Sequence, residues 1–341
     1  MEKNDKIITS RRDFLRISGL AAGALTVDFW NNVPLALAKD IYPAGKITYI
    51  IPHKPGGGHD IYARAVSPYL TKYLRQLSPG ARGGEFLLKN EPAAAGAKGH
   101  SILFNAKPDG YTIGALETAV VSDNIMGTSE FDFTKLTFLL LAVSTTKMII
   151  TGKKGFNSWK ELTAAMKKDP VKLAVGSFGR TNHVCAIIIN EEMKTNFRLI
   201  PLPGTAESMN ALIRGDVPAA IVSEDVVKPL VDAKEVKVLL VFDEKSEYPG
   251  AVSIKELGFP GLADDISSHR FIVAPPKLAP EPKKILLEAI KKATTDKDFV
   301  AWAKKAEYPL KNVYGSDAEK IFLRVIKTYE SLTPLIKKNL S

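Results

Sequence analysis

Short apolar runs alternate with stretches of helical apolar spacing along most of this 341-residue chain. The run from Ile47 to Ile51 is rich in β-branched residues, as in a buried strand, and residues 61–77 repeat apolar side chains at helical spacing. This alternation predicts an α/β fold in which sheets are flanked by helices. Further strand-like runs are predicted at residues 86–89, 111–116, 172–176, 197–200, 218–222, 236–242 and 271–274.

A longer apolar run, residues 136–150, is interrupted by three hydroxyl side chains, Ser144, Thr145 and Thr146. It has the length of two successive strands, not of a membrane span. We therefore predict a pair of strands that crosses from one domain to the other. The chain is predicted to end in a helix with one apolar stripe, formed by Ile321, Phe322, Val325, Ile326, Tyr329 and Leu332.

The first strand leads into three consecutive glycines, Gly56, Gly57 and Gly58, and then to Asp60 as the predicted N-cap of the helix. Backbone N–H groups at such a helix start favour anions, so the loop predicts a site for phosphate or carboxylate. It lacks the Lys-Ser or Lys-Thr of a P-loop and the last glycine of the dinucleotide fingerprint. A tight turn that binds nothing remains the alternative.

A second strand–glycine–helix unit lies far along the chain, where residues 197–200 feed Gly204, Thr205 and Ala206. We expect the two glycine loops to converge on one ligand. Gly58 and Gly204 would then each hold a backbone N–H against the ligand, and a side chain at either position would displace the anion or strain the backbone.

Charge and composition narrow the class of protein. The formal charge of +10 is spread along the chain without a basic block, so we predict no nucleic-acid partner. Cys185 is the only cysteine, which excludes a disulfide framework and a thiolate metal cluster. The five histidines include no pair at metal-binding spacing on one helix, and we predict neither a metal nor a cofactor.

The first 38 residues have the features of an export signal. Residues 10–16 form a twin-arginine pattern around Arg11 and Arg12, followed by a weakly apolar stretch that is too short and glycine-rich to span a bilayer. Ala36 and Ala38 frame a small-x-small cleavage site. We therefore predict a periplasmic protein with a mature start at Lys39 and no lipid anchor.

Several of these stretches together resemble one family, the periplasmic receptors of tripartite tricarboxylate transporters, also called Bug proteins. Residues 52–60 are similar to the family's P-aromatic-x-P-G-G-x-x-D loop, and residues 108–112 match its Pro-Asp-Gly-Tyr-Thr pentapeptide. Weaker likenesses are found at residues 90–99, 131–133, 158–162, 176–183 and 203–215. They follow the family order over essentially the whole mature chain.

The resemblance implies a two-lobed periplasmic binding protein of the Venus-flytrap type, an α/β fold in which each lobe is a sheet flanked by helices. Lobe 1 would use residues 39–141 and 265–341, and lobe 2 residues 142–264. It implies a monomer that captures a small organic carboxylate, delivers it to the membrane permease subunits of a transporter, and is not an enzyme. The ligand-binding residues carried over or placed beside these motifs are His53, Gly57, Gly58, His59, Asp60, Thr118, Ser177, Arg180, Thr181, Gly204, Thr205 and Ala206.

Three departures from the family pattern leave the ligand open. His53 stands where the family has Phe or Tyr, and Glu117 would repel a carboxylate unless it is paired or protonated. Arg180 lies in a loop of small residues and would meet an anionic group or face solvent. Two other functions stay as alternatives: an enzyme exported in its folded state, and a ligand sensor that feeds a membrane signalling receptor.

Overall fold

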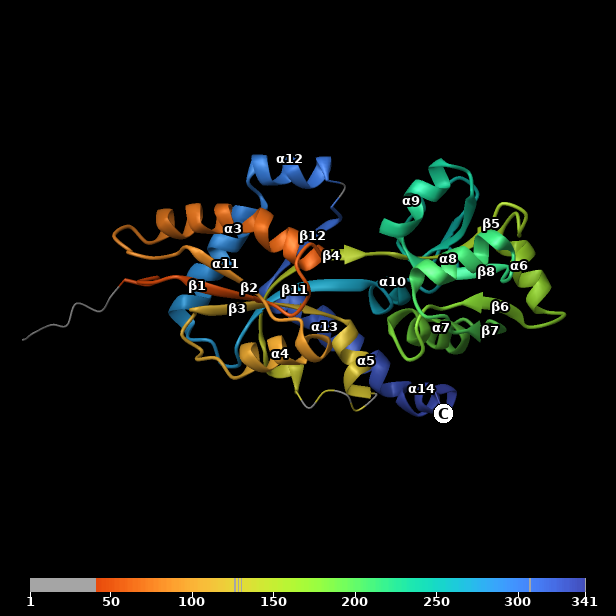
Figure 1. Cartoon of the computed structure of the whole chain (residues 1–341), viewed down its shortest axis with the longest axis horizontal. Helices are drawn as coiled ribbons and strands as arrows, with labels where there is room; N and C mark the ends of the chain where they lie inside the picture. Colours follow the sequence, from red (N-terminus) through yellow and green to blue (C-terminus); the bar gives the residue numbers. More distant parts are fainter. Residues whose placement is uncertain (1–40, 126, 128, 130, 307, 341) are drawn as a thin grey trace, which may run out of the picture. The chain divides into compact units, whose positions relative to one another are not determined.

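The computed structural model describes residues 41–125, 127, 129, 131–306 and 308–340. The described strands form two six-stranded sheets. The first has the order β12-β4-β11-β3-β1-β2, in which β1 is parallel to β2 and β3 while β11 runs antiparallel to β3 and β4 (Figure 1). Its strands are β1 (Ile47–Ile51), β2 (Phe86–Asn90), β3 (Thr112–Glu117), β4 (Thr137–Thr145), β11 (Ser268–Ala274) and β12 (Leu310–Tyr314).

Helices cover both faces of this sheet. Because side chains alternate between the two faces along a strand, neighbouring residues of one strand contact different helices. On β11, Ile272 packs with α3 (Gly58–Leu77) and α11 (Pro280–Thr294), whereas its neighbours Phe271 and Val273 pack on the opposite side. That second side is covered by α4 (Ala97–Phe104), α5 (Ala119–Ile125) and α13 (Gly315–Ser331). The remaining short elements here are η1 (Ala93–Gly96), η2 (Phe133–Lys135), α12 (Lys297–Lys305) and α14 (Thr333–Leu340).

The second sheet has the order β10-β9-β5-β8-β6-β7, with β6, β7 and β8 parallel. One of its faces packs against α6 (Trp159–Met166) and α7 (Thr181–Glu192), and the other against α8 (Thr205–Arg214) and α9 (Glu224–Asp232). Its strands are β5 (Lys147–Gly152), β6 (Val171–Ala174), β7 (Phe197–Ile200), β8 (Ala219–Ser223), β9 (Val236–Val241) and β10 (Val252–Ser253).

The long apolar run is two strands, as predicted. β4 belongs to the first sheet and β5 to the second, with Thr146 alone between them, and α10 (Gly261–Asp265) precedes β11 on the way back. The α/β prediction of two sheets flanked by helices is confirmed. The predicted boundary after residue 141 lies inside β4, and the predicted signal segment, residues 1–38, lies outside the described residues. No helix in the described part of the chain is long and apolar enough to cross a membrane.

Candidate ligand-binding site

A cavity of about 260 Å³ lies where β6, β7 and β8 end and β5 begins. The carboxyl ends of parallel strands are the usual place for ligands in open α/β sheets. We call this cavity the lysine pocket. It is lined by Lys147, Val175, Gly176, Ser177, Arg180, Thr181, Asn182, Gly204, Thr205, Ser223 and Ser268.

Two helices begin at the lysine pocket. Arg180 is the N-cap of α7 and Gly204 the N-cap of α8, and within the described chain neither helix start has a side-chain cap hydrogen bond. The backbone N–H groups of a first helical turn have no partner inside the helix, and they carry a partial positive charge. Two such ends at one cavity favour an anion with acceptor oxygens.

Lys147 adds a full positive charge to the pocket. It is the first residue of β5 and only 3% exposed, and its ammonium donates a 2.7 Å hydrogen bond to the hydroxyl of Ser223. Among the described residues that line the pocket, none is acidic. An ammonium in a pocket with several hydroxyl side chains can donate a charge-assisted hydrogen bond to a carboxylate oxygen.

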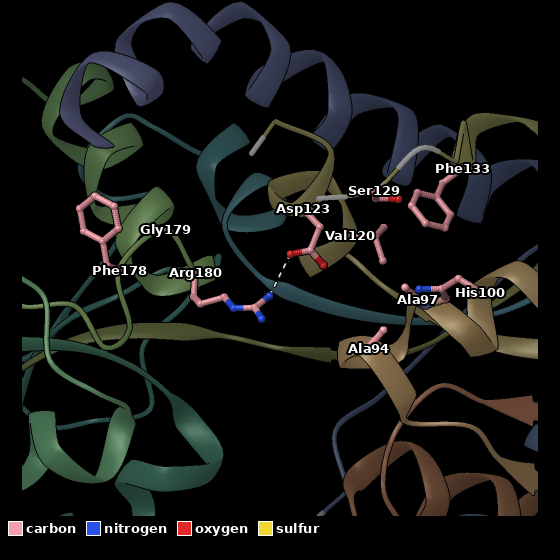
Figure 2. Close-up of a pocket in the computed structure, with 10 residues that line it drawn as sticks. All are labelled: Ala94, Ala97, His100, Val120, Asp123, Ser129, Phe133, Phe178, Gly179 and Arg180. Carbon is pink, nitrogen blue, oxygen red and sulfur yellow. Dashed lines mark hydrogen bonds and ion pairs between the residues drawn. The ribbon is translucent and has the colours of Figure 1, made fainter. Parts of the chain in front are cut away.

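Arg180 also borders a second cavity of about 320 Å³, shown in Figure 2. Its guanidinium donates to the carboxylate of Asp123 on α5 at 2.8 Å, and the Arg180 side chain is also 55% exposed to solvent. Burial raises the pKa of Asp123, and the Arg180 charge opposes that rise. The cavity is lined by Ala94, Ala97, His100, Val120, Asp123, Ser129, Phe133, Phe178, Gly179 and Arg180.

The first glycine loop begins its helix earlier than predicted. α3 starts at Gly58 with Gly57 as N-cap, so Asp60 lies in the first turn and is not the N-cap. The Asp60 carboxylate accepts from the Gly56 amide at 2.9 Å, from Arg64 Nε at 2.9 Å and from the Asn90 side chain at 3.0 Å. The Arg64 hydrogen bond, helped by the other two and opposed by burial, lowers the Asp60 pKa to about 2. Asp60 therefore ties the loop to the sheet.

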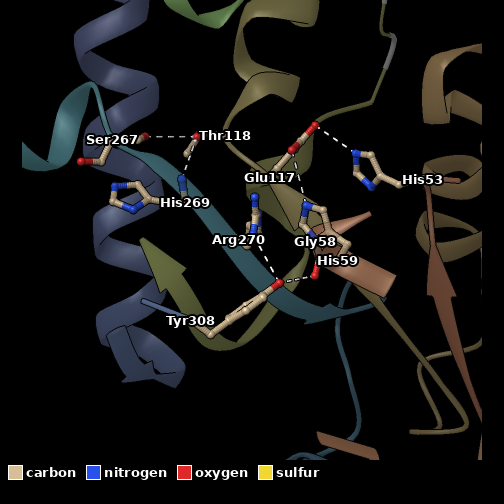
Figure 3. A network of polar contacts seen from close by, with 9 residues as sticks. All are labelled: His53, Gly58, His59, Glu117, Thr118, Ser267, His269, Arg270 and Tyr308. Atoms are coloured by element: carbon tan, nitrogen blue, oxygen red, sulfur yellow. Dashed lines mark hydrogen bonds and ion pairs between the residues drawn. The ribbon is translucent and has the colours of Figure 1, made fainter. Parts of the chain in front are cut away.

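Gly58 lies against the chain's own side chains. A Cβ built on Gly58 would lie 2.6 Å from the Arg270 guanidinium. The backbone carbonyl of Gly58 accepts a hydrogen bond from the Tyr308 hydroxyl (Figure 3). The expected backbone strain is wrong for Gly204, whose φ of −177° is extended and open to any residue. A Cβ on Gly204 would meet the carboxylate end of Glu207 at 2.9 Å.

His53 and His59 come together beside this loop. Their rings stack with centroids 4.4 Å apart, and both Nε2 atoms face the carboxylate of Glu117 at 3.1 and 3.4 Å (Figure 3). Burial disfavours the Glu117 carboxylate, but the two imidazoles outweigh burial and hold its pKa well below the ordinary value. Of the two possibilities that the sequence left open for Glu117, pairing or protonation, the structure shows pairing with His53 and His59.

Thr118 is 2% exposed and joins β3 to β11. Its hydroxyl accepts from the His269 amide at 3.2 Å and donates to the Ser267 carbonyl at 3.4 Å. Of the twelve predicted residues, the lysine pocket gathers Ser177, Arg180, Thr181, Gly204 and Thr205. The other seven are not among its lining residues: His53, Gly57, Gly58, His59, Asp60, Thr118 and Ala206.

Comparison with known proteins places the chain. The sequence profile of the tripartite tricarboxylate transporter family receptor matches residues 74–339. The chain belongs to this family. A Cupriavidus necator protein described as a UPF0065 protein in the gbd 5' region is 27% identical over 289 residues, which cover 83% of this chain and 84% of that protein.

Two solved structures share the fold. A TctC solute-binding protein from Polaromonas, without ligand, superposes with a TM-score of 0.74 at 23% identity over 87% of this chain and 99% of that one. A Rhodopseudomonas palustris protein with adipate superposes with a TM-score of 0.64 at 19% identity over 87% and 98% of the two chains. The receptor therefore has the periplasmic solute-binding fold.

Sequence reasoning missed six residues that line the lysine pocket: Lys147, Val175, Gly176, Asn182, Ser223 and Ser268. Lys147 directly follows the three hydroxyl residues that interrupt the apolar run at residues 136–150. A charged residue inside such a run is unusual, and this position could have indicated a functional residue. Ser268 reaches the pocket because β11 returns to the first sheet from more than one hundred residues away, and no local pattern reports such a contact.

Proposed function

We propose that this receptor captures a small organic carboxylate in the lysine pocket and delivers it to the membrane permease subunits of a tripartite transporter. The observation that carries the proposal is the meeting of the buried Lys147 ammonium with the N-termini of α7 and α8. One carboxylate placed there accepts from the ammonium, from backbone N–H groups and from hydroxyls.

The ligand contacts that we propose form two sets. Ser177, Thr181 and Thr205 belong to the lysine pocket. The hydroxyls of Thr181 and Thr205 add donors beside Lys147, whereas the Ser177 hydroxyl donates to the Pro203 carbonyl at 2.6 Å and leaves its oxygen as an acceptor. The first glycine loop supplies the other set through its helix start. The adipate of the structurally similar R. palustris protein supports a small carboxylate as the class of ligand.

The proposal includes export and lobe organisation. The twin-arginine pattern supports transport to the periplasm with cleavage near Ala38, and the receptor would act there as a monomer. We assign residues 39–141 and 265–341 to lobe 1 and residues 142–264 to lobe 2. The division of strands supports this, because β5 to β10 all belong to the second sheet.

A thermal-shift screen of mono-, di- and tricarboxylates tests the proposal, since a ligand that binds the native state raises the unfolding midpoint. Calorimetric titration of Lys147→Met should then show binding weaker by about ten- to a hundredfold, because one charge-assisted hydrogen bond contributes roughly 1.5–3 kcal/mol. Lys237→Met on β9, whose ammonium contacts Asn157 instead, is the matched control and should bind like the parent. Equal affinity in both variants would place the ligand elsewhere.

A further inference from the structure

Three side chains from three separate segments bring metal-binding atoms together beside the first glycine loop. His53 follows β1, His59 lies in the first turn of α3, and Glu117 ends β3. Their ligand atoms, two imidazole nitrogens and a carboxylate oxygen, all lie within 4.8 Å of one another. The sequence analysis considered only histidine pairs at metal-binding spacing on one helix. This group was not predicted because its three residues come from different segments that only the fold brings together.

The distances suit a small transition-metal ion. Zinc binds imidazole nitrogen and carboxylate oxygen at about 2.0–2.2 Å, so two donors on a tetrahedral ion are about 3.3 Å apart. Here the two Nε2 atoms are 3.1 and 3.4 Å from the two Glu117 oxygens. The stacked, nearly parallel rings, 7° apart, aim both nitrogens at the same carboxylate (Figure 3).

The three side chains are largely shielded from water, with exposed fractions of 31% for His53, 8% for His59 and 35% for Glu117. A metal would bind them as neutral imidazoles and an ionised carboxylate. In the described chain the buried Nδ1 of His53 has no hydrogen-bond partner, although the distal nitrogen of a metal-bound imidazole usually donates to a carbonyl, a carboxylate or water.

We propose that His53, His59 and Glu117 bind one divalent transition-metal ion, with zinc the best match, and leave a coordination position open. Imidazole ligands select such ions over magnesium and calcium, which prefer oxygen. Three protein ligands are the pattern of an open zinc site, in which water or a ligand oxygen completes the shell. The Arg270 guanidinium packs on Gly58 next to His59, and its charge opposes the metal while the Glu117 charge favours it.

The loaded site would carry an excess positive charge, because one carboxylate faces a dication and a guanidinium. The open position therefore favours an anionic oxygen over a neutral donor. This inference does not depend on the lysine pocket. If the receptor binds its carboxylate in the lysine pocket without a metal, the proposal of a metal site still stands. The two proposals are tested with different variants.

Untagged receptor, stripped with a chelator and dialysed, is titrated with zinc chloride by calorimetry and with cobalt chloride by visible absorption. We expect one ion per chain and intense cobalt bands from a site with fewer than six ligands. His53→Gln, His59→Gln and Glu117→Gln should each bind zinc more weakly by on the order of tenfold or more. His183→Gln, on α7, is the control for a histidine outside the group and should match the parent.

Imidazole nitrogen NMR of the unmodified receptor provides a second readout, in which the parent protein itself reports the metal ligands. Zinc should shift the nitrogen signals of two of the five histidines, and those signals should be absent from the His53→Gln and His59→Gln spectra. No zinc binding by the parent, equal binding by all four variants, or shifts confined to the other three histidines would each overturn the proposal.

Discussion

Asp60 offers a direct test of whether a predicted ligand residue instead holds the fold. Its carboxylate is 3% exposed and receives hydrogen bonds from Gly56, Arg64 and Asn90. The resulting fall in pKa from 3.8 to about 2 corresponds to about 2 kcal/mol of native-state stability at neutral pH. Arg64 is 56% exposed, so water weakens its share, and we expect Asp60→Asn to lose about 1–2 kcal/mol.

The pH dependence of that loss has a defined sign. Because the native pKa of Asp60 is lower than the unfolded value, its contribution is complete above pH 3.8 and disappears as the pH falls towards 2. The difference in unfolding free energy between the parent and Asp60→Asn should therefore be largest at pH 7 and shrink towards pH 2. Urea unfolding followed by circular dichroism at several pH values measures it.

Asp216→Asn is the matched control, since Asp216 pairs with Arg214 at the surface and exposed pairs contribute about 0–1 kcal/mol. It should change stability less than Asp60→Asn. Our reasoning is refuted if Asp60→Asn unfolds like the parent at every pH but binds its carboxylate more weakly, because that pattern belongs to a ligand contact.

Three further outcomes follow from burial and backbone geometry. Cys185 is fully buried and burial raises its thiol pKa, so a thiol reagent should label it only when denaturant unfolds the protein. Burial, opposed by the Asp264 carbonyl, lowers the His269 pKa to about 4, so the stability of the parent relative to His269→Gln should fall as the pH drops from 6.5 to 4. Gly204→Ala should fold with a change within about 1 kcal/mol, because its φ is extended and only the flexible end of Glu207 is close; loss of folding would contradict this.

The hydrophobic pattern predicted the strands and helices well, because the spacing of apolar residues in a strand or helix is visible within a few neighbouring residues. The run at residues 47–51 became β1 with the expected bounds, and the hydroxyl interruption at residues 144–146 marks the end of β4 and the step to β5. The predicted N-cap is wrong because α3 begins at Gly58, two residues before Asp60, and the Asp60 carboxylate accepts instead from the Gly56 amide, from Arg64 on α3 and from Asn90 on β2. The prediction of the N-cap used residue type alone.

The site was harder to predict, since its charges come from pairs distant in sequence. Glu117 was expected to repel a carboxylate unless it is paired or protonated, and it is paired with two histidines more than fifty residues earlier in the chain. Arg180 was left between an anion and solvent, and its partner Asp123 stands on a short helix that the sequence analysis did not predict. Such pairings depend on sheet order, which hydrophobic spacing does not encode.

β11 connects the two halves of the proposed ligand chemistry. Side chains two apart on a strand share a face, so Ser268 at the lysine pocket and Arg270 against Gly58 point the same way, about 7 Å apart along the strand. Arg270 is the cross-strand partner of Glu117, and Thr118 fixes that register through the His269 amide. A slip of one residue would turn both polar side chains to the other face and expose His269 in their place. The register of this one strand therefore determines which hydroxyl faces the lysine pocket and which cation faces the first glycine loop.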